Sequence, residues 1–124
     1  MAERKRVLIL DDSSIVLELV GEALDVAGLE PLTAPDLAHL ERRLGERPDL
    51  LVVDVNMPEA YGDDVGAVLR DVRGLQVPIV LFSALPMAEL AARAAEGGFT
   101  DYVSKDEGVE ALVAKIKQVL GLDA

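Results

Sequence analysis

The sequence predicts an α/β domain with a doubly wound, five-stranded parallel sheet. Five short apolar runs recur along the 124 residues, and longer stretches with helical spacing of apolar residues separate them. This alternation of strand and helix patterns is typical of parallel sheets that helices cover on both faces. The runs are apolar at almost every position, which indicates strands buried on both sides. We therefore expect right-handed crossovers between successive strands.

The predicted strands share an apolar body and end at or near a polar residue. They cover residues 7–10, 29–33, 50–53, 77–82 and 99–103. Pro31 interrupts the second run, and a proline cannot donate a backbone hydrogen bond within a sheet. We therefore expect Pro31 to lie in an edge strand or among the first residues of its strand.

The predicted helices share apolar residues at helical spacing, and glycine follows each of them. They cover residues 15–27, 36–44, 65–72 and 86–96, and a last helix opens at Asp106 or Glu107 and closes at Gly121. Ser13 or Ser14 suits the N-cap of the first helix, because a serine oxygen accepts hydrogen bonds from backbone N–H groups there. Pro86 suits a first helical turn, where its missing N–H has no partner to lose.

The composition excludes several classes of function. Acidic residues outnumber basic ones by 23 to 12, and the formal net charge of -11 argues against direct binding of nucleic acid. Cysteine is absent and there is one histidine, which excludes disulfides, zinc–thiolate sites and multi-histidine metal sites within one chain. No apolar stretch approaches the roughly 20 residues that span a bilayer, and no signal peptide is visible. We expect one cytoplasmic domain over residues 1–124, without a membrane span.

Polar residues gather at the predicted carboxyl ends of four strands. Asp11 and Asp12 follow the first strand, Asp54 the third, Ser83 the fourth and Lys105 the fifth. In open parallel sheets this edge is where ligands bind, so we expect these side chains to meet. Three carboxylates in one crevice repel each other unless a cation is present, and Mg2+ prefers carboxylate, carbonyl and water oxygens. A carboxylate, Mg2+, a lysine and a hydroxyl together suit phosphoryl transfer, with the carboxylate as nucleophile.

Each of these residues also has a plainer interpretation. Asp11 and Asp12 could end a strand and cap the helix that follows, and Ser83 could cap the fourth predicted helix. Lys105 alone would be a solvated surface charge. The presence of Asp54 and Lys105 together with the aspartate pair favours the metal interpretation.

These stretches resemble the receiver domain of two-component response regulators, and the resemblance covers essentially the whole chain. Five segments carry it in this order, each of them weak alone: Val7 to Ser13, Asp49 to Pro58, Gly62, Pro78 to Ala84, and Asp101 to Lys105. The resemblance implies a flavodoxin-like sheet with strand order 2-1-3-4-5. It also implies a phosphoacceptor signalling switch rather than an enzyme, with at most slow self-phosphorylation and self-dephosphorylation.

The resemblance assigns a role to each carboxylate of the cluster. Asp54 is implied as the residue that accepts the phosphoryl group. Asp11, Asp12 and Asp54 are implied as ligands of Mg2+, together with the backbone carbonyl of Asn56. The implied phosphodonor is a histidine kinase or a phosphotransfer protein.

The same resemblance implies a switch. Ser83 would hydrogen-bond the phosphoryl group, and Lys105 would complete the site. Tyr102 would turn inward when Ser83 is drawn toward the phosphate, although simple packing is its plainer interpretation. No output domain follows Gly121, so we expect contact with an unidentified downstream protein to carry the signal, unless the chain is a fragment. Pairing of two copies on phosphorylation is a further hypothesis.

The sequence departs from the family pattern at two positions. Asp106 follows Lys105 where the family usually has proline, commonly with a cis bond that costs about 2.5–4 kcal/mol without proline. We therefore expect the loop to be trans or strained. Leu85, two residues after Ser83, should affect the access of water. The alternative function is a phosphorylation-independent, receiver-like interaction module. A Mg2+-dependent phosphohydrolase is a third class, but Asn56 stands where it needs a second carboxylate, and 124 residues leave no room for a cap.

Overall fold

The computed structural model describes residues 4–54 and 76–122, and it confirms the predicted α/β architecture. Its elements in chain order are β1 (Arg6–Leu10), α1 (Ser14–Val26), β2 (Glu30–Ala34), α2 (Leu37–Arg43), a 3-10 turn η1 (Leu44–Glu46), β3 (Leu50–Val53), β4 (Ile79–Ser83), α4 (Met87–Glu96), β5 (Asp101–Ser104), a 3-10 turn η2 (Lys105–Glu107) and α5 (Val109–Leu120). The predicted strand boundaries agree with these to within two residues. The helix predicted over 65–72 lies outside the described residues.

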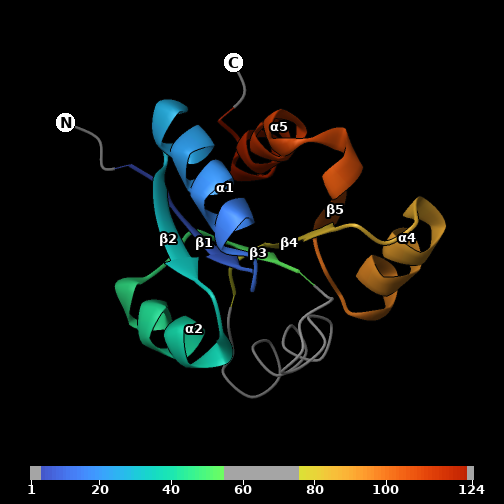
Figure 1. The fold of residues 1–124 in the computed structure, drawn as a ribbon, viewed down its shortest axis with the longest axis horizontal. Helices are drawn as coiled ribbons and strands as arrows, with labels where there is room; N and C mark the ends of the chain where they lie inside the picture. The colour runs from blue at the N-terminus through green and yellow to red at the C-terminus, as the bar shows by residue number, and fades with distance from the viewer. Residues whose placement is uncertain (1–3, 55–75, 123–124) are drawn as a thin grey trace.

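The sheet is parallel throughout, and its strand order is β2-β1-β3-β4-β5 (Figure 1). β2 lies at one edge and carries Pro31, as the sequence predicts. From β1 the chain goes outward to β2 and then crosses back to β3, so the order reverses between β1 and β3. In open α/β sheets a crevice for ligands forms at the carboxyl ends of the two strands that flank such a reversal.

Neighbouring residues of each strand point into two separate cores. Leu8 and Leu10 belong to the core that α2 and α4 cover, whereas Val7 and Ile9 belong to the core that α1 and α5 cover. Figure 1 shows α1 and α5 side by side over one side of the sheet. Burial of each such aliphatic side chain stabilises the fold by roughly 1.5–3 kcal/mol. Buried strands therefore hold the carboxyl ends in fixed register.

Side-chain caps begin two of the helices. The Ser13 hydroxyl accepts a hydrogen bond from the backbone N–H of Val16 at 3.3 Å, which confirms Ser13 as the N-cap of α1. Asp36 caps α2 by accepting from the N–H of His39 at 2.8 Å. Hydrogen bonds from His39 to this exposed carboxylate lower the pKa of Asp36. The polar residues before α1 and α2 thus fix where these helices begin.

The start of α4 differs from the prediction. Pro86 is the N-cap itself rather than a residue of the first turn, and no side chain caps the helix. Ser83 is not that cap, because its hydroxyl accepts from the N–H of Leu85 at 3.4 Å, upstream of the helix. Ser83 is the last residue of β4 and is too far back along the chain to reach the first N–H groups of α4.

The last helix begins later than predicted. Asp106 and Glu107 belong to the short turn η2, and α5 starts only at Val109. Gly108 separates the two with a φ of 92°, a conformation that interrupts helical hydrogen bonding and that side chains with a Cβ rarely adopt. The peptide between Lys105 and Asp106 is trans, as are the other bonds of the described chain.

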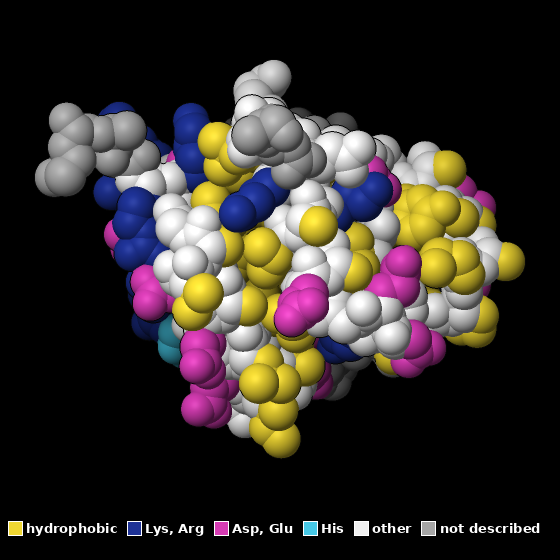
Figure 2. Space-filling view, turned by 90° about the horizontal axis from the view of Figure 1, so that it is seen from above, with side chains coloured by type: hydrophobic (Ala, Val, Ile, Leu, Met, Phe, Trp, Pro, Cys, Tyr) yellow, Lys and Arg dark blue, Asp and Glu magenta, His cyan; other side chains and the backbone are white. Residues whose placement is uncertain are grey.

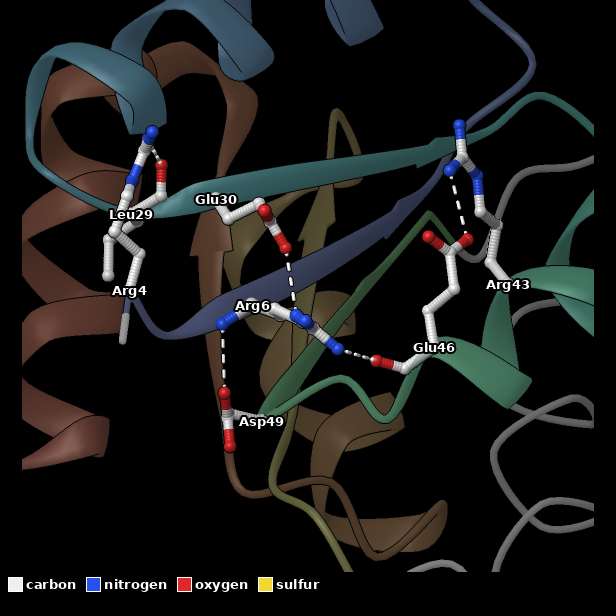
Figure 3. Close-up of polar contacts among 7 residues, drawn as sticks. All are labelled: Arg4, Arg6, Leu29, Glu30, Arg43, Glu46 and Asp49. Carbon is white, nitrogen blue, oxygen red and sulfur yellow. Dashed lines mark hydrogen bonds and ion pairs between the residues drawn. The ribbon is translucent and has the colours of Figure 1, made fainter. Parts of the chain in front are cut away.

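Polar contacts hold the amino-terminal end of the sheet (Figure 3). The backbone N–H of Arg6 donates to the Asp49 carboxylate at 2.8 Å, and the Arg6 side chain pairs with Glu30 at 2.8 Å and donates to the Glu46 carbonyl. Arg43 pairs with the Glu46 carboxylate at 2.9 Å. These contacts tie β1, β2 and the segment before β3 together at the end opposite the predicted site.

Charge and apolar surface are distributed unevenly over the outside. Figure 2 shows Lys and Arg side chains gathered on the side of the N-terminus and hydrophobic side chains at the other end, where α4 lies. Met87 in α4 is 49% exposed. Within residues 4–54 and 76–122, no helix has the length and apolar character needed to cross a membrane.

Candidate functional site

Three carboxylates meet at the carboxyl ends of β1 and β3. Carboxylate oxygens of Asp11, Asp12 and Asp54 all lie within 4.8 Å of one another. The ladder extends one residue beyond each strand, since the N–H of Asp11 donates to the Ala34 carbonyl and that of Asp54 to the Leu10 carbonyl. Asp11 and Asp54 are only 2% and 5% exposed, whereas Asp12 faces solvent. The parallel register thus brings the predicted cluster together.

Lys105 reaches into this cluster from η2, immediately after β5. Its Nζ lies 2.8 Å from Oδ2 of Asp11 and 3.1 Å from Oδ2 of Asp54. It also stands over the ring of Phe82, 5.9 Å from the ring centre, where the π-face attracts a cation weakly. The ammonium group therefore bridges the two buried carboxylates across the end of β4.

The two partners respond to burial in opposite ways. Burial raises the pKa of Asp11, although the hydrogen bond and charge of Lys105 and the N–H of Ser13 oppose that rise. Burial alone would lower the pKa of Lys105, but its hydrogen bonds and charge interactions with Asp11 and Asp54 outweigh this and raise that pKa. The two carboxylates therefore favour the charged form of Lys105, while burial makes ionisation of Asp11 less favourable than in water.

The Asp11 side chain is oriented from both sides. Its Oδ1 accepts from the backbone N–H of Ser13 at 2.9 Å, and its Oδ2 meets Lys105. The same Ser13 caps α1 through its hydroxyl. The turn from β1 into α1 thus fixes the direction of this carboxylate, which two independent contacts hold.

The donor set fits a hard divalent cation. Three carboxylates face one ammonium group among the described residues, so the cluster carries an excess of two negative charges when all are ionised. Oxygen ligands at a partly solvated crevice are the set that Mg2+ binds, usually with several waters retained. Asp12, on the solvent side, leaves such a cation open to water. Asn56, whose carbonyl the resemblance adds to this set, lies outside the described residues.

Ser83 and Tyr102 lie on the neighbouring strands. Ser83 ends β4 fully buried, and Tyr102 lies beside Leu81 in the β4–β5 register. Tyr102 is half-buried and packs against the core beneath α4, and Leu85 packs against the same core. Packing is thus the interpretation of Tyr102 that these contacts support, and its role as a switch stays a prediction.

Sequence reasoning missed two residues beside the site. Ser104 and Glu107 form a reciprocal capping box around Lys105. The signal was present as Ser-Lys-Asp-Glu before an apolar helical pattern, because a serine followed three residues later by glutamate is typical of such a box. The box competes with a second pattern, because Asp106 and Glu107 also suit the first turn of the last helix.

Comparisons with known proteins agree with this geometry. The family model for the response regulator receiver domain matches residues 7–117. The transcriptional regulatory protein PrrA of Mycobacterium bovis is 37% identical over 93% of this chain, and the chain spans about half of its length, 49%. The polar-differentiation response regulator DivK of Brucella anthropi is 30% identical over 94% of this chain and 97% of its own.

Solved structures show the same fold. The chemotaxis response regulator CheY4 of Vibrio cholerae superposes with a TM-score of 0.81 and 28% identity, over 94% of this chain and 99% of that protein. Receiver domains are regulatory signalling domains that interact with histidine kinases or phosphotransfer proteins and bind Mg2+ in an acidic pocket. With the strand order, the acidic cluster and the family match in agreement, this chain belongs to the response regulator receiver domain family.

Proposed function

We propose that the chain is a phosphoacceptor switch in which Asp54 takes a phosphoryl group from a histidine kinase or phosphotransfer protein. One observation carries the proposal: Asp54 is buried at the end of β3, with Lys105 at 3.1 Å and two further aspartates around it. We place this activity in a single receiver domain over residues 1–124 and in the cytoplasm.

The transfer forms one bond and breaks another. A carboxylate oxygen of Asp54 attacks phosphorus, and the bond from phosphorus to the imidazole nitrogen of the donor breaks, with that nitrogen taking up a proton. Lys105 stands where its ammonium can stabilise negative charge on the transferred group, since it already contacts Asp54. Ser83 ends the adjacent strand, and its hydroxyl can donate to a phosphoryl oxygen while it accepts from Leu85.

The acidic cluster would hold the cofactor. Asp11, Asp12 and Asp54 would bind Mg2+, with the Asn56 carbonyl as the fourth protein ligand. When bound, the ion supplies positive charge that offsets the charge of the phosphoryl oxygens. Asp11 is pre-oriented for this by the N–H of Ser13. Loss of the phosphoryl group would be slow hydrolysis at Asp54, not turnover of an external substrate.

The output would be a change of surface. Movement of Ser83 toward the phosphoryl group would vacate space beneath the loop before α4, and Tyr102 would turn inward from its half-buried position. This surface, with Met87 and Lys115 beside Tyr102, would then bind an unidentified downstream protein or a second copy of the chain. Size exclusion with and without a phosphoryl mimic tests the second copy, and no shift in either state rules it out.

The alternative function, a phosphorylation-independent interaction module, is supported only by Asp106 in place of a proline. Lys105 reaches Asp11 and Asp54 with aspartate at that position, at 2.8 and 3.1 Å. This contact favours the phosphoacceptor function over the silent module.

Intact-protein mass spectrometry tests the proposal. The protein is incubated with Mg2+ and acetyl phosphate, and we expect one added phosphoryl group that is absent when a chelator replaces Mg2+. Asp54→Ala should take up none. Asp49→Ala is the matched control, because Asp49 lies before the same strand at the opposite end of the sheet, and it should be modified like the wild type. A folded wild type without an adduct, with several phosphodonors and short reaction times, would support the silent module instead.

A further inference from the structure

The position of Lys105 depends on the short turn that follows β5. The side chain must cross from the edge strand to the carboxyl ends of β1 and β3 to meet Asp11 and Asp54. A lysine has a long, flexible side chain, so the direction of its backbone decides how often the ammonium reaches its partners. Lys105 is the first residue of η2 and is therefore held in a helical conformation.

Two reciprocal hydrogen bonds enclose this residue. The hydroxyl of Ser104 accepts from the N–H of Asp106 at 3.2 Å, and the Glu107 carboxylate accepts from the N–H of Ser104 at 3.0 Å. The carbonyl of Lys105 itself accepts from the N–H of Gly108 at 3.1 Å. Contacts on both sides of Lys105 along the chain thus fix its backbone.

The Glu107 contact also completes the end of an edge strand. β5 has β4 on one side and no further strand on the other, so outward N–H groups of β5 lack a neighbouring strand as acceptor. Ser104 is only 5% exposed, and a buried N–H without an acceptor destabilises the fold. Glu107, which is itself exposed, supplies that acceptor from three residues further along.

The box does not serve α5. That helix begins at Val109, and its N-cap is Gly108, which has no side chain to offer. The positive φ of Gly108 separates the box from the helix. The residue that the box encloses and that reaches the acidic cluster is Lys105.

We propose that Ser104 and Glu107 are positioning residues that hold Lys105 against Asp54 and Asp11. The inference rests on the proposed function for its consequence in phosphoryl transfer, but not for the placement of the ammonium group. Without the box the turn loosens, and Lys105 spends less time at the two carboxylates. The rate of Asp54 phosphorylation then falls although neither Ser104 nor Glu107 touches the reacting atoms.

The first readout reports the position of Lys105 directly. In the 15N-labelled chain, an ammonium group held by two carboxylates and shielded from water exchanges its protons slowly and gives a resolved NMR signal. Lys105→Met identifies this signal by its loss. We expect this signal in the wild type and in Glu107→Gln, whose amide oxygen still accepts from Ser104. We expect it to be lost in Glu107→Ala. A signal that persists in Glu107→Ala, or that is absent from the wild type, overturns the inference.

Position 104 offers a second, matched pair of variants. Ser104→Thr keeps the hydroxyl that accepts from the N–H of Asp106 and should leave the Lys105 signal intact. Ser104→Ala removes that hydroxyl, so the signal should disappear. This pair keeps the test decisive if Glu107→Ala folds poorly. A Lys105 signal in folded Ser104→Ala would contradict the proposal as well.

The second readout is the initial rate of Asp54 phosphorylation with acetyl phosphate and Mg2+. We expect a fall of about tenfold in Glu107→Ala and Ser104→Ala, because misplacement of a charged group by about 1 Å is costly in catalysis. Glu107→Gln should restore the rate. A purely structural role would lower the melting temperature and leave both the rate and the Lys105 signal unchanged. The two proposals can fail separately. If the wild type takes no phosphoryl group but Glu107→Ala still loses the Lys105 signal, the proposed function is refuted. The role of Ser104 and Glu107 in positioning Lys105 is then still supported.

Discussion

The two ends of the sheet both carry charged side chains, and they pair them differently. At the amino-terminal end Arg6 meets Asp49, Glu30 and the Glu46 carbonyl, and the groups of its ion pair with Glu30 are 41% and 43% exposed. At the carboxyl-terminal end three carboxylates face the single ammonium of Lys105 among the described residues, and two of them are nearly inaccessible to water.

The different pairing of charges indicates different roles for the two ends of the sheet. An exposed ion pair loses little hydration when it forms, and it contributes little to the free energy of unfolding, typically less than about 1 kcal/mol. Buried carboxylates in excess of their partners destabilise a fold, and such an arrangement is expected only where a ligand completes it. The amino-terminal end therefore joins strands, and the carboxyl-terminal end has an excess of carboxylates that a bound cation would offset. Substitutions at the carboxyl-terminal end should change phosphorylation or Mg2+ binding, whereas substitutions at the amino-terminal end should change stability alone.

The largest effect should follow removal of the ammonium group. Lys105→Met is expected to lower the initial rate of Asp54 phosphorylation by about 10²-fold, as loss of one charge-stabilising donor does in other sites. Arg6→Met, its counterpart at the other end, should leave that rate unchanged and lower only the stability. Quench-flow mass spectrometry with acetyl phosphate measures both. Equal rates for Lys105→Met and wild type would remove Lys105 from the mechanism.

Asp11→Asn should weaken Mg2+ binding and stabilise the fold at the same time. We expect the affinity for Mg2+ to fall by about tenfold or more, measured by calorimetry. The folded state raises the pKa of Asp11 above its ordinary value of 3.8, so ionisation of this group costs stability as the pH rises through the interval between the two values. Asparagine does not ionise, and it keeps an oxygen for Ser13.

The stabilisation by Asp11→Asn should therefore be absent near pH 3, grow as the pH rises above 3.8, and level off once the pH exceeds the raised pKa of Asp11 in the folded state. Thermal melts of both proteins across this range measure it. A melting temperature that is lower for Asp11→Asn than for wild type at pH 7 would show that the contact with Lys105 outweighs the burial of the charge.

Asp49→Ala should act on stability alone. Its carboxylate accepts from the N–H of Arg6 at the start of β1, and this N–H would lose its partner. We expect a loss of about 1–2 kcal/mol in the free energy of unfolding, measured by urea titration. Phosphorylation and Mg2+ affinity should match those of the wild type, and a change in either would show that the two ends of the sheet are coupled.

The smallest effect should follow Glu30→Gln. Its ion pair with Arg6 is half-exposed, and its removal should cost less than about 1 kcal/mol. At about 1 M salt, where the Debye length is near 3 Å, the difference between Glu30→Gln and wild type should shrink. A difference that does not change with salt would mean that Glu30 contributes by packing rather than by charge.

The fold and the acidic cluster could be predicted because both follow from periodicity. Continuous apolar runs indicate buried parallel strands, and parallel strands must bring Asp11, Asp54 and Lys105 to one edge. The strand ends agree with the prediction to within one residue, because each continuous apolar run stops where the strand leaves the sheet. The cluster needed no knowledge of side-chain conformation, since the register alone brings the three residues together.

The turns were less predictable from the sequence, because a polar side chain there can accept a hydrogen bond from more than one nearby backbone N–H group. Ser83 has a good capping side chain, yet it ends β4 and bonds to Leu85, and α4 begins without a side-chain cap. Gly108 reads as part of a helix start, but its positive φ divides η2 from α5. A glycine gives no signal of the sign of its φ in the sequence, so the break between η2 and α5 could not be predicted from Gly108.

The proline in β2 has a consequence for the behaviour of the protein at high concentration. Glu30 donates its N–H inward to the Lys5 carbonyl, so the next residue of the strand, Pro31, faces the open edge and has no N–H to offer. Two residues on, the carbonyl of Thr33 is covered by the Arg43 side chain at 3.3 Å. A β-strand from another molecule would therefore have no N–H donor to pair with at Pro31 and no free carbonyl acceptor at Thr33. This edge therefore protects the chain from strand-to-strand aggregation while it leaves the opposite edge of the sheet to other contacts.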